Sequence, residues 1–131
     1  MSYTTERRFS APVKDVEEAT EEALKDEGFG VLCDIQIDEK FREKLDEEFR
    51  EYRILGACNP PLAHTALEEE IGIGALLPCN VIVYRDGDET VVEAVDPEEM
   101  LSVVDNPELD EIAEEVGEKL DTVLRSIKPG T

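Results

Sequence analysis

The chain has 131 residues and carries 13 lysine and arginine side chains against 34 aspartate and glutamate side chains, so its formal net charge at pH 7 is −21. A chain of this length is expected to form one domain, residues 1–131, with a core that needs no disulfide or metal. The acidic balance argues against unassisted binding to nucleic acid or to an anionic membrane, because both require a positive surface.

The first half of the chain alternates between the apolar period of a strand and that of a helix. The predicted elements are, in order, a strand at 2–9, a helix between Ser10 and Gly28, a strand at 29–37, a short charged helix at about 38–47 and a strand at 52–58. Ser10 is expected to cap the first helix, and Gly28 to end it, because glycine adopts the left-handed conformation without strain. In the second helix, Phe41 and Leu45 are four residues apart and are expected to face inward.

The second half contains two further strands, and its helices begin at prolines. The predicted elements are, in order, a brief helix at 62–69, an irregular apolar segment at 71–78, a strand at 79–85, a strand at about 90–95, a short helix from Asp96-Pro97 to about Val103 and a long helix from Asn106-Pro107 to Lys128-Pro129-Gly130. The sequence Asp86-Gly87-Asp88 predicts a tight hairpin turn. The last helix carries one continuous apolar stripe, expected to be core, formed by Leu109, Ile112, Ala113, Val116, Leu120, Val123, Leu124 and Ile127.

Strands two to five mostly follow one another through short connections. This order predicts an α+β fold, with an antiparallel sheet of about five strands and the two long helices on one face. The acids fill the gaps of the apolar pattern along the whole chain, as is typical of a solvated shell on a folded protein.

The charge also suggests where the protein works. Self-repulsion of this size destabilises the compact state at low salt, so we expect a salt-adapted protein. An acidic partner-binding protein from an ordinary cell is the alternative. An odd number of cysteines, three, does not form a disulfide framework, and no segment approaches the roughly 18 apolar residues of a membrane span. The N-terminus lacks a signal pattern, and we therefore expect reduced thiols in the cytoplasm.

Chemistry is expected between residues 54 and 84, where thiols, amides and prolines replace the acids. Two Cys-Asn pairs, Cys58-Asn59 and Cys79-Asn80, each lie beside a proline, and the single histidine, His64, lies between them. If the third and fourth strands are antiparallel neighbours, both thiols lie at the same end of the sheet. The sequence therefore predicts a small binding or sensing module with its site at this end.

Three interpretations of the motif stay open. The thiols can be small buried groups, with each asparagine tying the backbone at a strand end, in a structural or interaction domain without chemistry. Cys58 and Cys79 can act in thiol redox or sulfur transfer, because the short helix opened by Pro60 can lower a thiol pKa. Cys58, His64 and Cys79 can bind a metal such as zinc, or Asn59, Asn80 and Tyr84 can line a pocket for a small ligand without metal.

The stretches Gly56-Ala57-Cys58-Asn59-Pro60 and Leu76-Leu77-Pro78-Cys79-Asn80 give the chain a likeness to a known family. With Gly28-Phe29-Gly30, Asp96-Pro97 and Asn106-Pro107 also fitting, the sequence resembles the domain of unknown function 302 family over nearly its full length. The resemblance implies a curved antiparallel sheet with helices on one side, similar to the TATA-binding-protein-like class, and makes a homodimer unsurprising. It implies no established activity and no role for Cys33.

Overall fold

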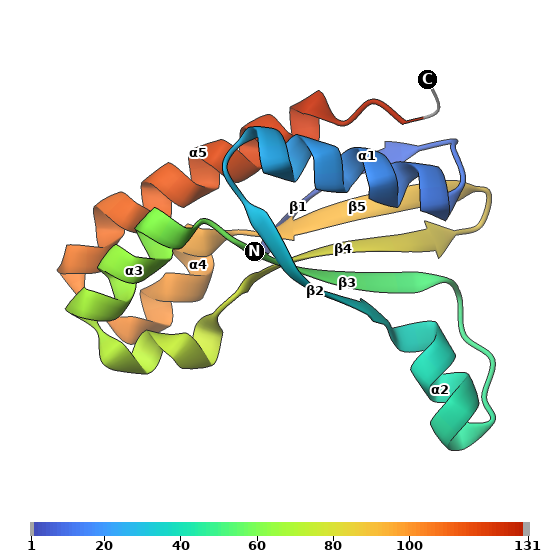
Figure 1. Ribbon diagram of the computed structural model, residues 1–131, viewed down its shortest axis with the longest axis horizontal. Helices are drawn as coiled ribbons and strands as arrows, with labels where there is room; N and C mark the ends of the chain where they lie inside the picture. Colours follow the sequence, from blue (N-terminus) through green and yellow to red (C-terminus); the bar gives the residue numbers. More distant parts are fainter. Residues whose placement is uncertain (1, 130–131) are drawn as a thin grey trace.

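The computed structural model describes residues 2–129 (Figure 1). Its elements are, in order, β1 (Thr4–Phe9), α1 (Val13–Asp26), β2 (Gly30–Gln36), α2 (Ile37–Leu45), β3 (Tyr52–Cys58), α3 (Pro60–Glu69), the 3₁₀ helix η1 (Ile71–Leu76), β4 (Cys79–Asp86), β5 (Glu89–Val95), α4 (Pro97–Leu101), the 3₁₀ helices η2 (Ser102–Val104) and η3 (Pro107–Leu109), and α5 (Asp110–Ser126). Gly130, predicted to help end the last helix, lies outside the described residues.

The five strands form one sheet in the order β1-β5-β4-β3-β2. Every neighbouring pair is antiparallel, which confirms the predicted α+β fold and the predicted number of strands. The two long helices, α1 and α5, lie side by side on one face of the sheet, as expected (Figure 1). The likeness to the TATA-binding-protein-like class stays a prediction, as does the single domain. Within residues 2–129, no helix is long and apolar enough to cross a membrane.

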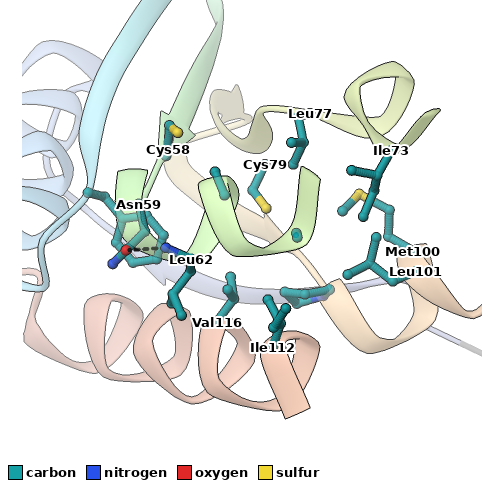
Figure 2. A pocket seen from close by; sticks show the side chains of 15 residues that line it. Cys58, Asn59, Leu62, Ile73, Leu77, Cys79, Met100, Leu101, Ile112 and Val116 are labelled. Atoms are coloured by element: carbon teal, nitrogen blue, oxygen red, sulfur yellow. Dashed lines mark hydrogen bonds between the residues drawn. The ribbon is translucent and has the colours of Figure 1, made fainter. Parts of the chain in front are cut away.

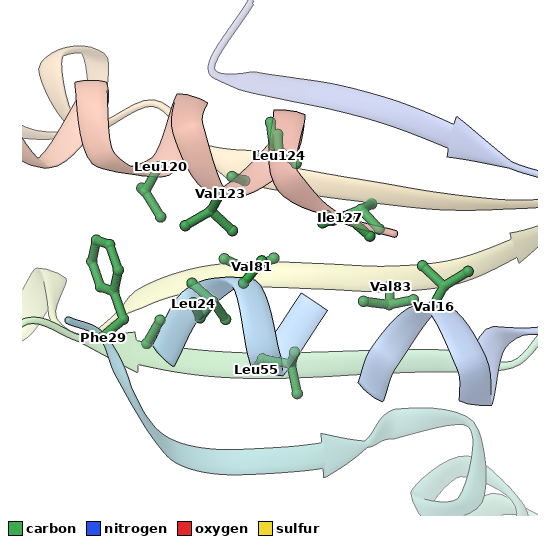
Figure 3. Packing of buried hydrophobic residues seen from close by; sticks show 14 of the residues in the cluster. Val16, Leu24, Phe29, Leu55, Val81, Val83, Leu120, Val123, Leu124 and Ile127 are labelled. Atoms are coloured by element: carbon green, nitrogen blue, oxygen red, sulfur yellow. The ribbon is translucent and has the colours of Figure 1, made fainter. Parts of the chain in front are cut away.

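The core lies between these two helices and the sheet (Figure 3). Val81 and Val83, alternate residues of the central strand β4, are completely buried under Leu24 of α1 and Leu120 of α5, which are at most 2% exposed. The intervening residue, Ile82, points to the other face, because successive side chains of a strand alternate. The apolar stripe predicted on the last helix is therefore core, as expected.

Two glycines adopt positive φ where the chain must turn sharply. Gly28 has φ 85 just after α1, and the N–H of Phe29 reaches back to the last turn of that helix, as a glycine-ended helix requires. Gly87 has φ 63 in the hairpin between β4 and β5, where Asp86 pairs with Glu89. Both positions confirm the sequence prediction, since glycine adopts this conformation at no steric cost.

The helix starts predicted at Asp96-Pro97 and Asn106-Pro107 are capped by the side chains of Asp96 and Asn106. Asp96 accepts the backbone N–H of Glu98 at 3.0 Å, and Asn106 caps the 3₁₀ turn ahead of α5 in the same way. The prediction for Ser10 is wrong, because the residue before α1 is Pro12 and no side chain caps that helix. A side-chain cap must lie immediately before the first turn, and Ser10 lies too early to reach those N–H groups.

The inward face predicted for α2 is also wrong. The Leu45 side chain is 64% exposed, whereas Asp38 is only 6% exposed. α2 projects from the end of the sheet and does not cover it (Figure 1), so its apolar residues have little to pack against. Phe41 instead meets Phe49 edge to face, with ring centroids 5.3 Å apart. Asp38 can be buried because its carboxylate accepts a hydrogen bond from the Arg53 guanidinium, with 2.9 Å between the Oδ1 and Nη1 atoms.

Candidate functional site

The two motif cysteines lie at the same end of the sheet, as the sequence predicts. β3 and β4 are antiparallel neighbours, and Ala57 pairs directly with Cys79. Because side chains alternate along a strand, Cys58 and Cys79 are out of phase and point to opposite faces. Figure 2 shows the Cys79 sulfur directed towards the helices, whereas the Cys58 sulfur points away from them.

Beside these cysteines lies an apolar cavity, enclosed by the sheet end, α3, η1, α4 and α5 (Figure 2). Its volume is about 40 Å³, more than the 10–15 Å³ that one water molecule needs. The motif supplies Cys58, Asn59 and Cys79 to its wall, and the rest of the wall is apolar. The residues labelled in Figure 2 that complete it are Leu62, Ile73, Leu77, Met100, Leu101, Ile112 and Val116.

Cys79 is held as a neutral thiol. It is 8% exposed, and burial, followed by the nearby charge of Cys58, raises the pKa of its thiol to about 11. A thiolate at this position would have to lose most of its hydration without a cation to replace it. Cys79 therefore contributes a small, weakly polar surface to the cavity instead of a nucleophile at neutral pH.

Asn59 has a structural task within the site. Its Oδ1 accepts the backbone N–H of Leu62 at 3.4 Å, and it is the N-cap of α3. Pro60 follows as the first helical residue, where its missing N–H leaves no bond unmade. The Asn59 amide nitrogen also lies 3.3 Å from the point where a Cβ on Gly28 would stand. Asn59 therefore joins the start of α3 to the end of α1.

Steric crowding explains why residue 56, in the first motif, is a glycine. A Cβ built on Gly56 would stand 2.6 Å from the Cys33 sulfur and 2.8 Å from the Pro78 ring, closer than real contacts allow. Cys33 itself is exposed, on β2. Cys33 and Pro78 thus pack against the bare backbone of Gly56, on the face away from the helices, and hold β2 and the start of β4 to β3.

The fold does not place His64 beside the thiols of Cys58 and Cys79. Its side chain is 76% exposed on α3, where the Nδ1 atom lies 3.5 Å from a Glu68 carboxylate oxygen one turn later. Between residues 2 and 129, no three His, Cys, Asp or Glu side chains are arranged to hold a metal ion. The fold therefore does not assemble the metal ligands that the sequence suggested, Cys58, His64 and Cys79.

Asn80 and Tyr84 lie on the sheet face opposite the cavity. Asn80 is exposed, and Tyr84 stacks on Tyr52 with ring centroids 5.3 Å apart. The Tyr84 hydroxyl donates to a Glu93 carboxylate, and its pKa is raised first by burial and then by that carboxylate. Neither residue lines the cavity, so the sequence-based pocket of Asn59, Asn80 and Tyr84 is not assembled.

Sequence reasoning missed the far wall of the cavity. Met100 comes from α4, while Ile112 and Val116 come from the stripe of α5 that the sequence marked only as core. Phe29, between α1 and β2, also lines the cavity. The available signal was indirect: a long apolar stripe indicates a covered helix face but does not tell which part of that face is filled.

Comparison with known proteins finds relatives of the whole chain. A family model described as "Domain of unknown function DUF302" matches residues 3–127. The crystal structure of an uncharacterized conserved DUF302 protein from Bacillus stearothermophilus shares 30% sequence identity, covers 98% of this chain and 100% of its own, and superposes with a TM-score of 0.92. A search of curated proteins finds no match. On its sequence and on its fold, the chain belongs to the DUF302 family.

Proposed function

We propose that the protein is a small-ligand binding or sensing module whose site is the apolar cavity beside Cys58 and Cys79. The observation that carries this proposal is the cavity itself, which is lined by Cys58, Asn59 and Cys79, receives the Cys79 thiol and is partly open to solvent. Apolar pockets with few polar groups are the usual form of small-molecule sites. The two Cys-Asn motifs of the sequence and the cavity of the fold thus lie at the same end of the sheet.

The lining indicates the class of ligand. It contains no charged side chain, and the raised pKa of Cys79 keeps that thiol neutral. A charged ligand would lose its hydration without a partner, so the ligand is uncharged and apolar. A volume of about 40 Å³ admits only a small group, and a longer ligand requires the flexible side chain of Met100 to move.

The test uses 1-butanol and butyrate, which differ in charge but little in size, and the smaller apolar atom xenon. Binding is followed by NMR of the Ala63, Ala66, Ile73 and Met100 methyl groups, all in the cavity wall. Xenon and 1-butanol are expected to give saturable shifts at these methyls, and butyrate none. The Ala66→Leu variant fills the cavity and is expected to weaken binding of the probes at least tenfold. The control, Ala75→Leu, makes the same change at an exposed position and is expected to leave probe binding unchanged.

Two outcomes would contradict the proposal. One is the absence of saturable shifts with any probe in the wild-type protein. The other is equal binding by the wild-type protein and a correctly folded Ala66→Leu variant, because the probe would then occupy another site. The Ala75→Leu control separates loss of the cavity from a general effect of added apolar bulk.

Thiol redox or sulfur transfer has less support. Cys58 and Cys79 point to opposite faces, and a disulfide requires their Cβ atoms to point towards each other. The raised pKa of Cys79 also opposes attack by its thiolate. The cytoplasmic location and the homodimer remain proposals as well. Sedimentation equilibrium tests the dimer, with twice the 14.7 kDa of one chain expected and 14.7 kDa contradicting it.

A further inference from the structure

A second feature lies on the face of the sheet that α1 and α5 leave uncovered. Three isoleucines are direct cross-strand neighbours there: Ile35 of β2 pairs with Ile54 of β3, and Ile54 pairs with Ile82 of β4. The same register continues through Glu93 of β5 to Glu6 of β1. Cross-strand partners point to the same face of a sheet. These five side chains therefore form one cross-strand row, which is apolar at one end and acidic at the other.

The acidic end of this row is not neutralised by its neighbours. Glu93 accepts hydrogen bonds from two hydroxyl groups, which carry no charge. Glu6 lies 3.4 Å from the Arg8 guanidinium. Two further carboxylates lie nearer to the same guanidinium, Asp86 at 3.0 Å and Glu89 at 3.2 Å. Because Glu6 and Glu93 are directly opposed like charges, this end of the row favours an approaching cation.

The chain also carries a helix with the opposite charge. The basic side chains exposed on α2 are Lys40, Arg42 and Lys44, and the exposed acidic ones are Glu39 and Glu43. By contrast, α1 and α5 each carry six acidic and two basic residues. α2 therefore presents an excess of positive charge to solvent, in a chain whose net charge is −21.

The basic and apolar residues of α2 lie side by side. Lys40 and Lys44 are about one turn apart, and Leu45 lies next to Lys44 on the helix surface. Glu39 and Glu43 lie on the side away from Leu45. Leu45 is 64% exposed, and α2 projects from the end of the sheet (Figure 1). The chain itself thus leaves this side of α2 uncovered.

We propose that two copies of the chain dimerise through these two surfaces, with α2 of each copy lying along the cross-strand row of the other. Leu45 then packs on the isoleucines, and Lys40 and Lys44 extend towards the two carboxylates. The lengths match, because four interstrand spacings make a row about 19 Å long and the nine residues of α2 span about 14 Å. This interface deepens the homodimer proposal, on which it rests.

The surfaces themselves favour a second copy as the partner. Each chain has one projecting helix without a surface to pack on and one row without a cover. A two-fold axis places each helix on the row of the other copy at the same time, so both surfaces are covered by one interface. The positive charge of α2 also offsets the repulsion between two bodies of charge −21, which opposes contact between copies elsewhere.

The test is sedimentation equilibrium of the full chain, with the dissociation constant of the dimer as the readout. One KCl concentration is used, at which circular dichroism shows every variant to be folded. Leu45→Gln removes the apolar contact at an exposed position and is expected to raise the dissociation constant at least tenfold. Ile71→Gln, at an isoleucine of η1 that is 85% exposed, is the matched control and is expected to leave it unchanged.

A charge exchange tests whether the contact joins two copies. Changing Lys40 and Lys44 together to glutamate is expected to raise the dissociation constant at least tenfold more than the same change at Lys14 and Lys25, which are exposed on α1. Adding Glu6→Lys to the α2 variant is expected to restore dimerisation. β1 and β2 are opposite edges of the sheet, and α2 directly follows β2, so this recovery reports a contact between copies.

Three outcomes would overturn the interface. A monomeric wild-type protein removes the homodimer together with it. A dimer that is unaffected by Leu45→Gln leaves the homodimer standing but not this interface. The same holds if Glu22→Lys, at an exposed position on α1, rescues the α2 variant as well as Glu6→Lys does, because the recovery then reflects net charge alone. The cavity is tested separately, by probe binding, and stands or falls independently of all three.

Discussion

The three cysteines are expected to differ sharply in their reaction with iodoacetamide. Cys33 is exposed, Cys58 is half-buried and Cys79 is 8% exposed. Because the thiolate is the reactive form, the rate at a fixed pH depends on the thiol pKa. The expected order of alkylation is therefore Cys33, then Cys58, then Cys79.

The size of the effect at Cys79 follows from its environment. Burial and the charge of Cys58 raise the Cys79 pKa from 9.0 to about 11. Each pH unit changes the thiolate fraction tenfold, so at neutral pH that fraction falls about 100-fold below that of an ordinary thiol. Access to the buried sulfur also requires local opening of the fold, which can only slow the reaction further. The slowing relative to unfolded protein is thus at least about 100-fold.

The assay is a time course of iodoacetamide labelling at neutral pH and high salt, read by mass spectrometry of peptides containing each cysteine. The same reaction in denaturant is the control, since all three thiols then react alike. Alkylation of native Cys79 within tenfold of Cys33 would refute this reasoning. That result would also revive the thiol enzyme interpretation, which requires a reactive Cys58 or Cys79.

Two more predictions concern stability. Asp38→Ala is expected to lower the free energy of unfolding by about 3–5 kcal/mol, because it leaves the Arg53 guanidinium, 15% exposed, without its closest partner. Urea unfolding measures this, with the exposed Glu39→Ala as control, and a loss below about 1 kcal/mol for Asp38→Ala would contradict it. The net charge of −21 predicts that the protein unfolds as salt is lowered at neutral pH. Circular dichroism melting across a KCl series tests this, and full stability in dilute buffer would remove the case for salt adaptation.

Local chemistry in the sequence determined most of the secondary structure and the sheet. β3 begins and ends where its alternation predicts, at Tyr52 and Cys58, and the stripe of α5 is buried as its helical spacing predicts. Gly28 and Asp96 end and begin helices through groups that are neighbours along the chain. Such features are predictable because each depends on contacts within a few residues. The prediction that Cys58 and Cys79 lie at the same end of the sheet is also confirmed.

Only the tertiary structure decided what surrounds each side chain. Leu45 and Asp38, both in α2, show this in opposite directions, since the apolar residue is exposed and the acid is buried. The cavity is similar: Cys79 was visible in the sequence, but Met100 and Val116, which lie across from it, were not. Periodicity reports the faces of one segment, whereas burial depends on which distant segment packs against that face. A helix that projects from the sheet leaves its leucine in water, whereas the aspartate at the start of the same helix is enclosed beside Arg53 of β3.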